Sequence, residues 1–187
     1  IPLSAKALLS FGQIKEVKRL DLLLDAMPAV LKQHPDALLL IAGRPWKTDF
    51  SSYQEQIDRL GIQNACMTQI RFITDEELPY YYAVADLVVL PYERIYQSAV
   101  VIMAMSYGKA VLVSDLPGMS DIVSSDDYGY IFKQGNLTAL VQELCLALGD
   151  KTERQKRAYQ GLQHMRNDYD WNIIGKRTKE LYETINM

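Results

Sequence analysis

The chain has 187 residues, 49% of them hydrophobic and 23% charged, which is typical of a soluble globular domain with a substantial core. Its net charge of −3, without a clustered basic face, argues against a nucleic-acid partner. No apolar run approaches the roughly 20 residues of a membrane-spanning helix. We therefore expect one cytoplasmic domain over residues 1–187. Association of the full-length protein with the inner face of the membrane stays open.

Short apolar runs alternate with amphipathic helical stretches, and this pattern predicts an α/β fold with a doubly wound parallel sheet, as in Rossmann-like domains. The sheet core is expected over about residues 1–150 and C-terminal helices over 151–187. Strands are predicted at residues 7–11, 37–42, 70–73, 87–91, 110–113 and 128–132.

Helices are predicted between these strands. The first starts near Lys18 and carries Pro28, which should kink or split it. The others are expected over residues 53–60, from Thr74 with a capping box to Glu77, over 98–107, from an Asn136 cap to 148, and as two helices within 152–187 broken around 167–170.

Cysteine and histidine are too sparse to form a metal site. Cys66 and Cys145 are far apart and outside CxxC spacing, so we expect two reduced, buried thiols. His34 and His164 have no ligand-like neighbours in the sequence. Coordination by oxygen ligands alone is not excluded by the composition, but no acidic cluster indicates it.

Two loops after predicted strands are candidate ligand sites. In the loop 12–18, Gly12 allows a ligand to approach the backbone, and Lys15, Lys18 and Arg19 surround the start of the next helix, which favours anions. A solvated, charged turn is the alternative interpretation.

The second candidate loop is 92–99, which is followed by an apolar helix. Ser98 can cap that helix, or the N–H groups of Ser98 and Ala99 can bind a phosphate. Glu93, Arg94 and Gln97 favour the functional interpretation because they are polar residues between two buried elements.

Common catalytic motifs are missing from the sequence. It contains no P-loop and no G-x-S-x-G elbow, and Gly-Gln-Ile-Lys follows the first strand instead of a glycine-rich dinucleotide motif. The tyrosines 80–82 lie on a predicted helix, where packing is a better explanation than base stacking. Kinases, serine hydrolases and most NAD-dependent dehydrogenases are therefore disfavoured.

Taken together, the motifs resemble the C-terminal domain of family 4 (group 1) glycosyltransferases of the GT-B type, over nearly the whole chain and in the same order. They are the runs 11–14 with Lys18, 41–43, 85–91, 104–111 and 114–118, with Trp171 and Leu181-Tyr182 near the end. The resemblance implies retaining transfer of a sugar from a nucleoside diphosphate donor, UDP- or GDP-linked. It also implies a separate N-terminal acceptor-binding domain, which we expect to be absent from this sequence.

The resemblance also implies residue roles. Gly12 approaches the diphosphate and Lys18 neutralises it, while the backbone of Gln97, Ser98 and Ala99 faces the distal phosphate and the sugar. The ribose and base are expected near Gly43, Arg44, Phe72, Ile73 and Met103. No cofactor and no metal are expected, because the helix from Ser98 and the lysines would stabilise the leaving diphosphate.

The chain departs from the family pattern at several of these positions. The family often has arginine at the position of Gln13, where Lys15 could substitute. Many members have two glutamates at the positions of Ile95 and Met103, and a subgroup has glycine at the position of Ala99. The sequence assigns no catalytic residue. A non-catalytic binding or assembly domain, or a nucleotide-sugar epimerase of the same architecture, are therefore alternative functions.

Overall fold

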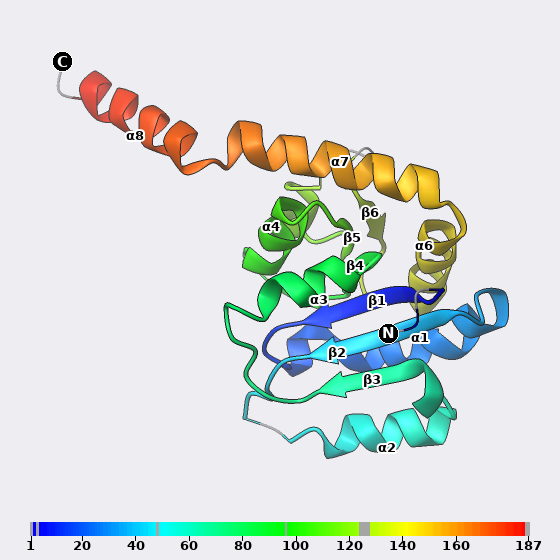
Figure 1. Ribbon diagram of the computed structural model, residues 1–187. Coiled ribbons are helices and arrows are strands. Elements are labelled where there is room, and N and C mark those ends of the chain that lie inside the picture. The colour runs from blue at the N-terminus through cyan, green and yellow to red at the C-terminus, as the bar shows by residue number, and fades with distance from the viewer. Residues whose placement is uncertain (1, 3, 48, 96, 124–127, 186–187) are drawn as a thin grey trace.

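The computed structural model describes residues 2, 4–47, 49–95, 97–123 and 128–185. A six-stranded sheet in the order β3-β2-β1-β4-β5-β6 has helices on both faces, and a helical arm extends from the body (Figure 1). All paired strands are parallel. The strand order reverses between β1 and β4, as in doubly wound nucleotide-binding sheets. The predicted fold class is confirmed.

The strands are short and mostly buried, as expected for a parallel sheet that is covered on both faces. They are β1 Lys6–Phe11, β2 Ala37–Ala42, β3 Cys66–Gln69, β4 Leu87–Leu90, β5 Ala110–Ser114 and β6 Tyr130–Phe132.

The helices cover both faces of the sheet, except for the last one, which extends away from it. They are α1 Leu20–Gln33, α2 Ser51–Leu60, α3 Leu78–Val84, α4 Ala99–Ser106, α5 Pro117–Ser120, α6 Leu137–Gly149, α7 Lys151–Asp168 and α8 Trp171–Ile185, with 3-10 turns η1 Glu16–Lys18 and η2 Gln63–Ala65. One hydrophobic core lies under α1, α2 and α6, and the other under α3, α4, α5 and part of α7.

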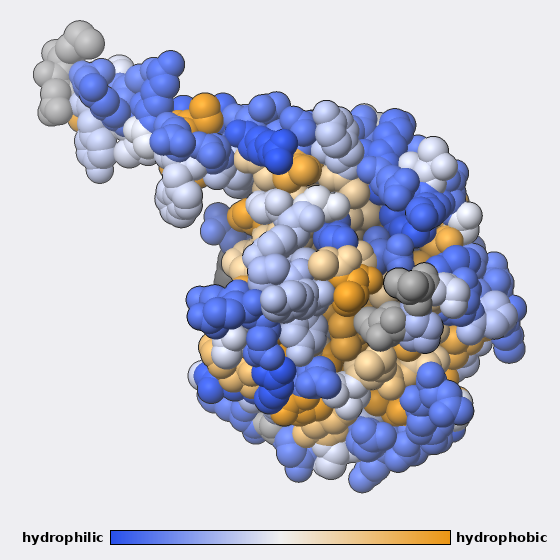
Figure 2. Space-filling view, viewed as in Figure 1, coloured by the Kyte–Doolittle hydropathy of each residue, from blue (hydrophilic) through white to orange (hydrophobic). Residues whose placement is uncertain are grey.

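Several helix ends follow the sequence signals. Gly61 ends α2 with a left-handed φ of 67°, and the Asn136 side chain accepts a hydrogen bond from the Ala139 N–H at 3.0 Å at the start of α6. The break between α7 and α8 falls at residues 169–170, as predicted. In Figure 2 the outer surface of these two helices, of which α8 extends from the body, is mostly hydrophilic on the face shown.

The strand predicted at residues 70–73 is wrong. The edge strand β3 ends at Gln69, and residues 70–73 form an irregular segment in which Phe72 is 64% exposed. Most β3 side chains are exposed, so the strand lacks the apolar pattern by which a sequence reveals a strand. The neighbouring apolar residues gave a false signal.

The helix expected from Thr74 begins later, at Leu78. Thr74 and Glu77 do interact, because the Glu77 carboxylate accepts a hydrogen bond from the Thr74 N–H at 3.1 Å, but they close a turn that precedes the helix. Pro79 lies in the first turn of α3, where its missing N–H costs nothing, and this explains the later start.

The prediction that Pro28 could split the first helix is wrong. α1 is one helix from Leu20 to Gln33, because its apolar face, including the fully buried Leu24 and Met27, packs against the sheet and outweighs the lost backbone hydrogen bond.

Both thiols are free but only half-buried, and not fully buried as the sequence suggested. Burial raises the pKa of Cys66 to about 11, so its thiol is protonated at neutral pH. None of the described helices combines the length and the apolar character that a membrane-spanning segment requires.

Candidate functional site

The loops after β1, β2 and β4 are joined by backbone hydrogen bonds at the carboxyl end of the sheet. The Glu93 N–H donates to the Val17 carbonyl at 2.8 Å, which connects the β4 loop with the β1 loop. The Ile14 N–H donates to the Arg44 carbonyl at 2.9 Å, which connects the β1 and β2 loops. β1 and β4 are neighbours at the point where the strand order reverses, and this is where ligands bind in sheets of this kind.

Gly12 lies where the first loop meets α4. Its φ is +97°, and a Cβ at this position would lie 3.1 Å from Lys18 Nζ and 3.8 Å from Val100 Cγ2. Gly43, with a φ of +147°, packs so closely that a Cβ would overlap the Gly12 carbonyl oxygen. The two glycines thus allow the β1 loop, the β2 loop and the first turn of α4 to approach one another closely.

Lys18 is a half-buried cation at this meeting point. Its Nζ lies 5.3 Å from the centroid of the Tyr92 ring and 3.5 Å from the Phe11 carbonyl oxygen. Burial, followed by the positive charge of Lys15, lowers the pKa of Lys18 to about 8. No carboxylate pairs with Lys18 among the residues that the structure describes, so its ammonium group lacks a counterion.

The amino end of α4 faces the same region. Ser98 is buried and caps the helix, and its hydroxyl accepts a hydrogen bond from the Val101 N–H at 3.4 Å. Within the described part of the chain, the N–H groups of Ala99 and Val100 have no acceptor. Unpaired amides at the start of a helix favour anions.

A pocket of about 520 Å³, called here the cationic pocket, lies between the β1 and β4 loops. The predicted residues Lys15, Lys18 and Gln97 line it. Lys15 Nζ also lies 5.2 Å from the centroid of the Trp46 ring. Ile95, at a position where many family members have glutamate, contributes an apolar wall. The complete lining is Lys15, Val17, Lys18, Tyr92, Arg94, Ile95 and Gln97. Tyr96, within the β4 loop, lies outside the described residues.

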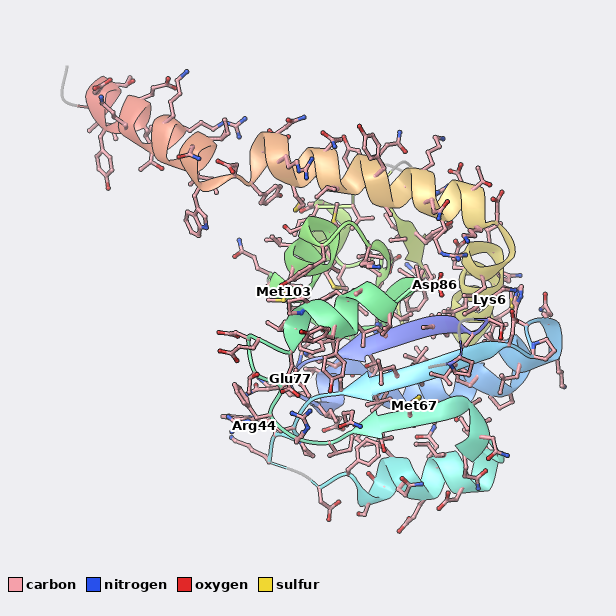
Figure 3. The ribbon with its side chains drawn as sticks, in the orientation of Figure 1. Lys6, Arg44, Met67, Glu77, Asp86 and Met103 are labelled. Carbon is pink, nitrogen blue, oxygen red and sulfur yellow. The ribbon has the colours of Figure 1, made fainter. Side chains whose placement is uncertain are left out.

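A second pocket of about 150 Å³, called here the glycine pocket, lies on the other side of Gly12. It contains most of the residues predicted for the ribose and base, but Met103 lies on α4, packed against the core. Its lining residues are Phe11, Gly12, Gln13, Gly43, Arg44, Arg71, Phe72 and Ile73. In Figure 3, Arg44, Glu77 and Met103 lie along the edge where the strands end.

An ion pair supports one wall of the glycine pocket. The Arg71 guanidinium donates to the Glu77 carboxylate at 2.8 Å and to the Phe72 carbonyl at 3.0 Å. The Arg71 hydrogen bonds hold the pKa of Glu77 down at about 2. This pair fixes the irregular segment that was predicted to be a strand.

Some contacts of the site left no signal in the sequence. Tyr92 and Trp46 position the two lysines through ring contacts, and Val17 connects the loops through its carbonyl. Tyr92 lies in the loop 92–99 that was predicted as a candidate, but its contact with Lys18 was not predicted. The described residues contain no group of three His, Cys, Asp or Glu side chains arranged to hold a metal.

The fold defines the class as a doubly wound α/β domain, with its candidate site at the carboxyl ends of the strands. The chain is a member of the group 1 glycosyl transferases, because the model of that family matches residues 1–164. It is 26% identical to phosphatidyl-myo-inositol mannosyltransferase of Mycobacterium leprae over 98% of this chain and 48% of that protein.

Solved structures show the same fold. The C-terminal domain of the group 1 family protein LpcC from Francisella tularensis has a TM-score of 0.79 and 22% identity, over 89% of this chain and 87% of that one. Anabaena HepE in complex with UDP has a TM-score of 0.87 and 19% identity, over 97% and 49%. The chain spans about half the length of the curated relatives it matches.

Proposed function

We propose that this chain is the donor-binding domain of a glycosyltransferase and binds a UDP- or GDP-linked sugar at the carboxyl end of its sheet. The observation that carries the proposal is Lys18, a cation without a counterion among the described residues, whose Nζ lies beside Gly12, the glycine that also borders Val100 in the first turn of α4. A diphosphate supplies the missing negative charge. It also accepts hydrogen bonds from the N–H groups of Ala99 and Val100, for which the described residues supply no acceptor.

The positions of the two pockets suggest how the donor is oriented in the site. In this proposal the diphosphate lies at Gly12 and Lys18, the nucleoside extends into the glycine pocket, and the sugar extends toward Gln97 and Ala99. Gln13 and Lys15 supply the remaining diphosphate contacts. The UDP in the HepE structure supports a nucleotide ligand for this fold.

We further propose that the full-length protein transfers a hexose with retention of configuration, in the synthesis of a polysaccharide or glycoconjugate. The mannosyltransferase among the relatives supports a hexose. The acceptor would be held by a second, N-terminal domain. As the bond to the sugar breaks, Lys18 and the α4 amides stabilise the charge on the leaving diphosphate, so that no metal is needed for this step.

A non-catalytic binding domain is a second candidate, favoured by one specific observation. Ile95 lines the cationic pocket and Met103 is packed against the core, at the two positions where many family members have glutamates. An assay of the full-length protein separates the candidates. Donor binding without transfer or hydrolysis favours the binding domain, and interconversion of nucleotide sugars without an acceptor identifies an epimerase.

Ligand-dependent thermal stability tests donor binding. UDP, GDP, UDP-glucose and GDP-mannose at millimolar concentration are added to the chain and to Lys18→Met. We expect at least one ligand to raise the melting temperature by mass action, and the variant to lose most of this increase. Lys32→Met, which changes an exposed lysine of α1, is the matched control. No shift with any of the four ligands contradicts the proposal.

A further inference from the structure

Basic and acidic side chains of the β1 and β4 loops line two different pockets. The cationic pocket is lined by Lys15, Lys18 and Arg94, and none of its described lining residues carries a carboxylate. Glu16 and Glu93 line a separate pocket with Arg19 and Asp21, which form an ion pair of 2.9 Å. The backbone hydrogen bond from the Glu93 N–H to the Val17 carbonyl joins the β4 loop to the β1 loop. These two loops contribute residues to both pockets. Neither Lys15 nor Arg94 forms an ion pair with a described residue.

The position of a donor sugar follows from the proposed function, on which this inference rests. A sugar is bonded directly to the second phosphate, so it lies next to the diphosphate at Gly12 and Lys18. The glycine pocket and the cationic pocket meet at these two residues. Since the nucleoside occupies the glycine pocket, the sugar must occupy the cationic pocket.

The cationic pocket offers many hydrogen-bond donors and few acceptors. Lysine and arginine side chains only donate, and Val17 and Ile95 do neither. Among the described lining residues, the Gln97 amide oxygen and the Tyr92 hydroxyl can accept a hydrogen bond from a sugar hydroxyl. A neutral hexose can accept hydrogen bonds from the basic side chains, but it leaves the charge of Arg94 without a counterion. A carboxylate on the sugar would supply that counterion.

The three cations are not equivalent. Lys18 Nζ lies beside Gly12, and Lys15 Nζ lies 5.2 Å from the centroid of the Trp46 ring in the β2 loop. The proposed function assigns both lysines to the diphosphate. Arg94 lies on the β4 loop beside Ile95, and its planar fork can bind a carboxylate through two parallel hydrogen bonds. Ile95 and Val17 offer apolar contact to the C–H groups of a sugar ring.

We propose that the donor sugar is a uronic acid, whose carboxylate is bound by Arg94 in the cationic pocket. Arg94 is thus the residue that selects the class of sugar, whereas Lys18 binds the diphosphate that every donor shares. The total charge also fits, since three cations face a diphosphate and a carboxylate.

Isothermal titration calorimetry at pH 7 with the whole chain tests the inference. The ligands are UDP, UDP-glucose and UDP-glucuronate, and in parallel GDP, GDP-mannose and GDP-mannuronate. We expect the uronate to bind about tenfold more tightly than its matched hexose in one of the two series, because hydrogen bonds to a charged partner are the stronger ones. Arg94→Gln should remove this preference and Arg94→Lys should keep part of it. Arg59→Gln, which changes an exposed arginine of α2, should keep all of it.

The outcomes separate the inference from the proposed function. If UDP or GDP binds but the uronate has no advantage, the inference is overturned and donor binding stands. If the advantage survives in Arg94→Gln, the assignment of the carboxylate to Arg94 is overturned. If neither nucleotide binds, the proposed function fails and the inference fails with it.

Discussion

Two basic side chains at opposite ends of the sheet show contrasting ways of placing a cation inside this fold. At the amino end, Arg154 is 4% exposed and is fully engaged: it pairs with Asp86 at 3.0 Å and donates to the Ala147 carbonyl at 2.6 Å. The other Asp86 oxygen accepts a hydrogen bond from the Ala7 N–H at 2.9 Å. At the carboxyl end, Lys18 is half-buried and has no carboxylate partner in the described structure. Figure 3 shows Asp86 on the side of the sheet away from Arg44.

The difference separates a structural cation from one available to a ligand. Removing a charge from water costs free energy unless another charge or several hydrogen bonds compensate for it. For Arg154 the protein supplies that compensation and thereby attaches α7 to the sheet. For Lys18 the compensation is incomplete, and an anionic ligand can complete it.

The largest effect on stability is expected from Asp86→Ala. This change leaves Arg154 buried without its counterion and deprives the Ala7 N–H of an acceptor, so the free energy of unfolding should fall by about 3 kcal/mol in urea titrations. The control is Asp36→Ala, which breaks an exposed pair with Lys6 and should cost less than about 0.5 kcal/mol. Nucleotide affinity should not change in either variant. A loss below about 1 kcal/mol for Asp86→Ala would contradict the structural role of the pair.

Lys18→Met should give the opposite pattern. Methionine keeps most of the buried aliphatic length and removes a charge that the fold leaves without a partner, so the free energy of unfolding should stay constant or rise. Affinity for UDP or GDP should fall by about tenfold or more, because a charge-assisted contact is lost. Calorimetry and urea titration of the same samples measure both quantities. A variant that loses both stability and binding would place Lys18 with Arg154, as a structural residue.

The features of the fold and site that could be predicted from the sequence are those with a local signal. The buried strands, Gly12 and the Ser98 cap were predictable because each is a local signal: an apolar run, a glycine after a strand, a hydroxyl before an apolar helix. The position of β3 was not predictable, since an exposed edge strand has no apolar pattern.

Contacts between distant segments were also out of reach of the sequence. Asp86 pairs with Arg154 across 68 positions of the chain, and Tyr92 meets Lys18 only because β1 and β4 are neighbours in the sheet. The sequence thus indicated which loops meet at the candidate site. It did not indicate which side chains there lack a counterion.

A smaller, pH-dependent effect should come from the lowered pKa of Lys18. Nucleotide affinity should decline as the pH rises through about 8, by up to about tenfold for each pH unit, because the amine must be protonated to bind the diphosphate. Stability without ligand should change in the opposite direction. Between about pH 8 and pH 10.4 the unfolded chain binds a proton that the native lysine has lost, so this contribution rises with pH. Lys18→Arg should bind without this decline, and an identical decline in Lys18→Arg would assign it to another group.

The smallest effect concerns a buried group that has neither a charge nor a partner. Tyr82 is fully buried, stacks on Tyr107 at 4.7 Å between ring centroids, and among the described residues its hydroxyl has no hydrogen-bond partner. Tyr82→Phe keeps the stacking and removes a polar group that folding takes out of water, so the free energy of unfolding should rise, by about 1 kcal/mol or less. Urea titration measures the change, and Tyr92→Phe, in which the altered ring also faces Lys18, gives the comparison at the site. A decrease in stability for Tyr82→Phe would mean that the Tyr82 hydroxyl forms a hydrogen bond in solution.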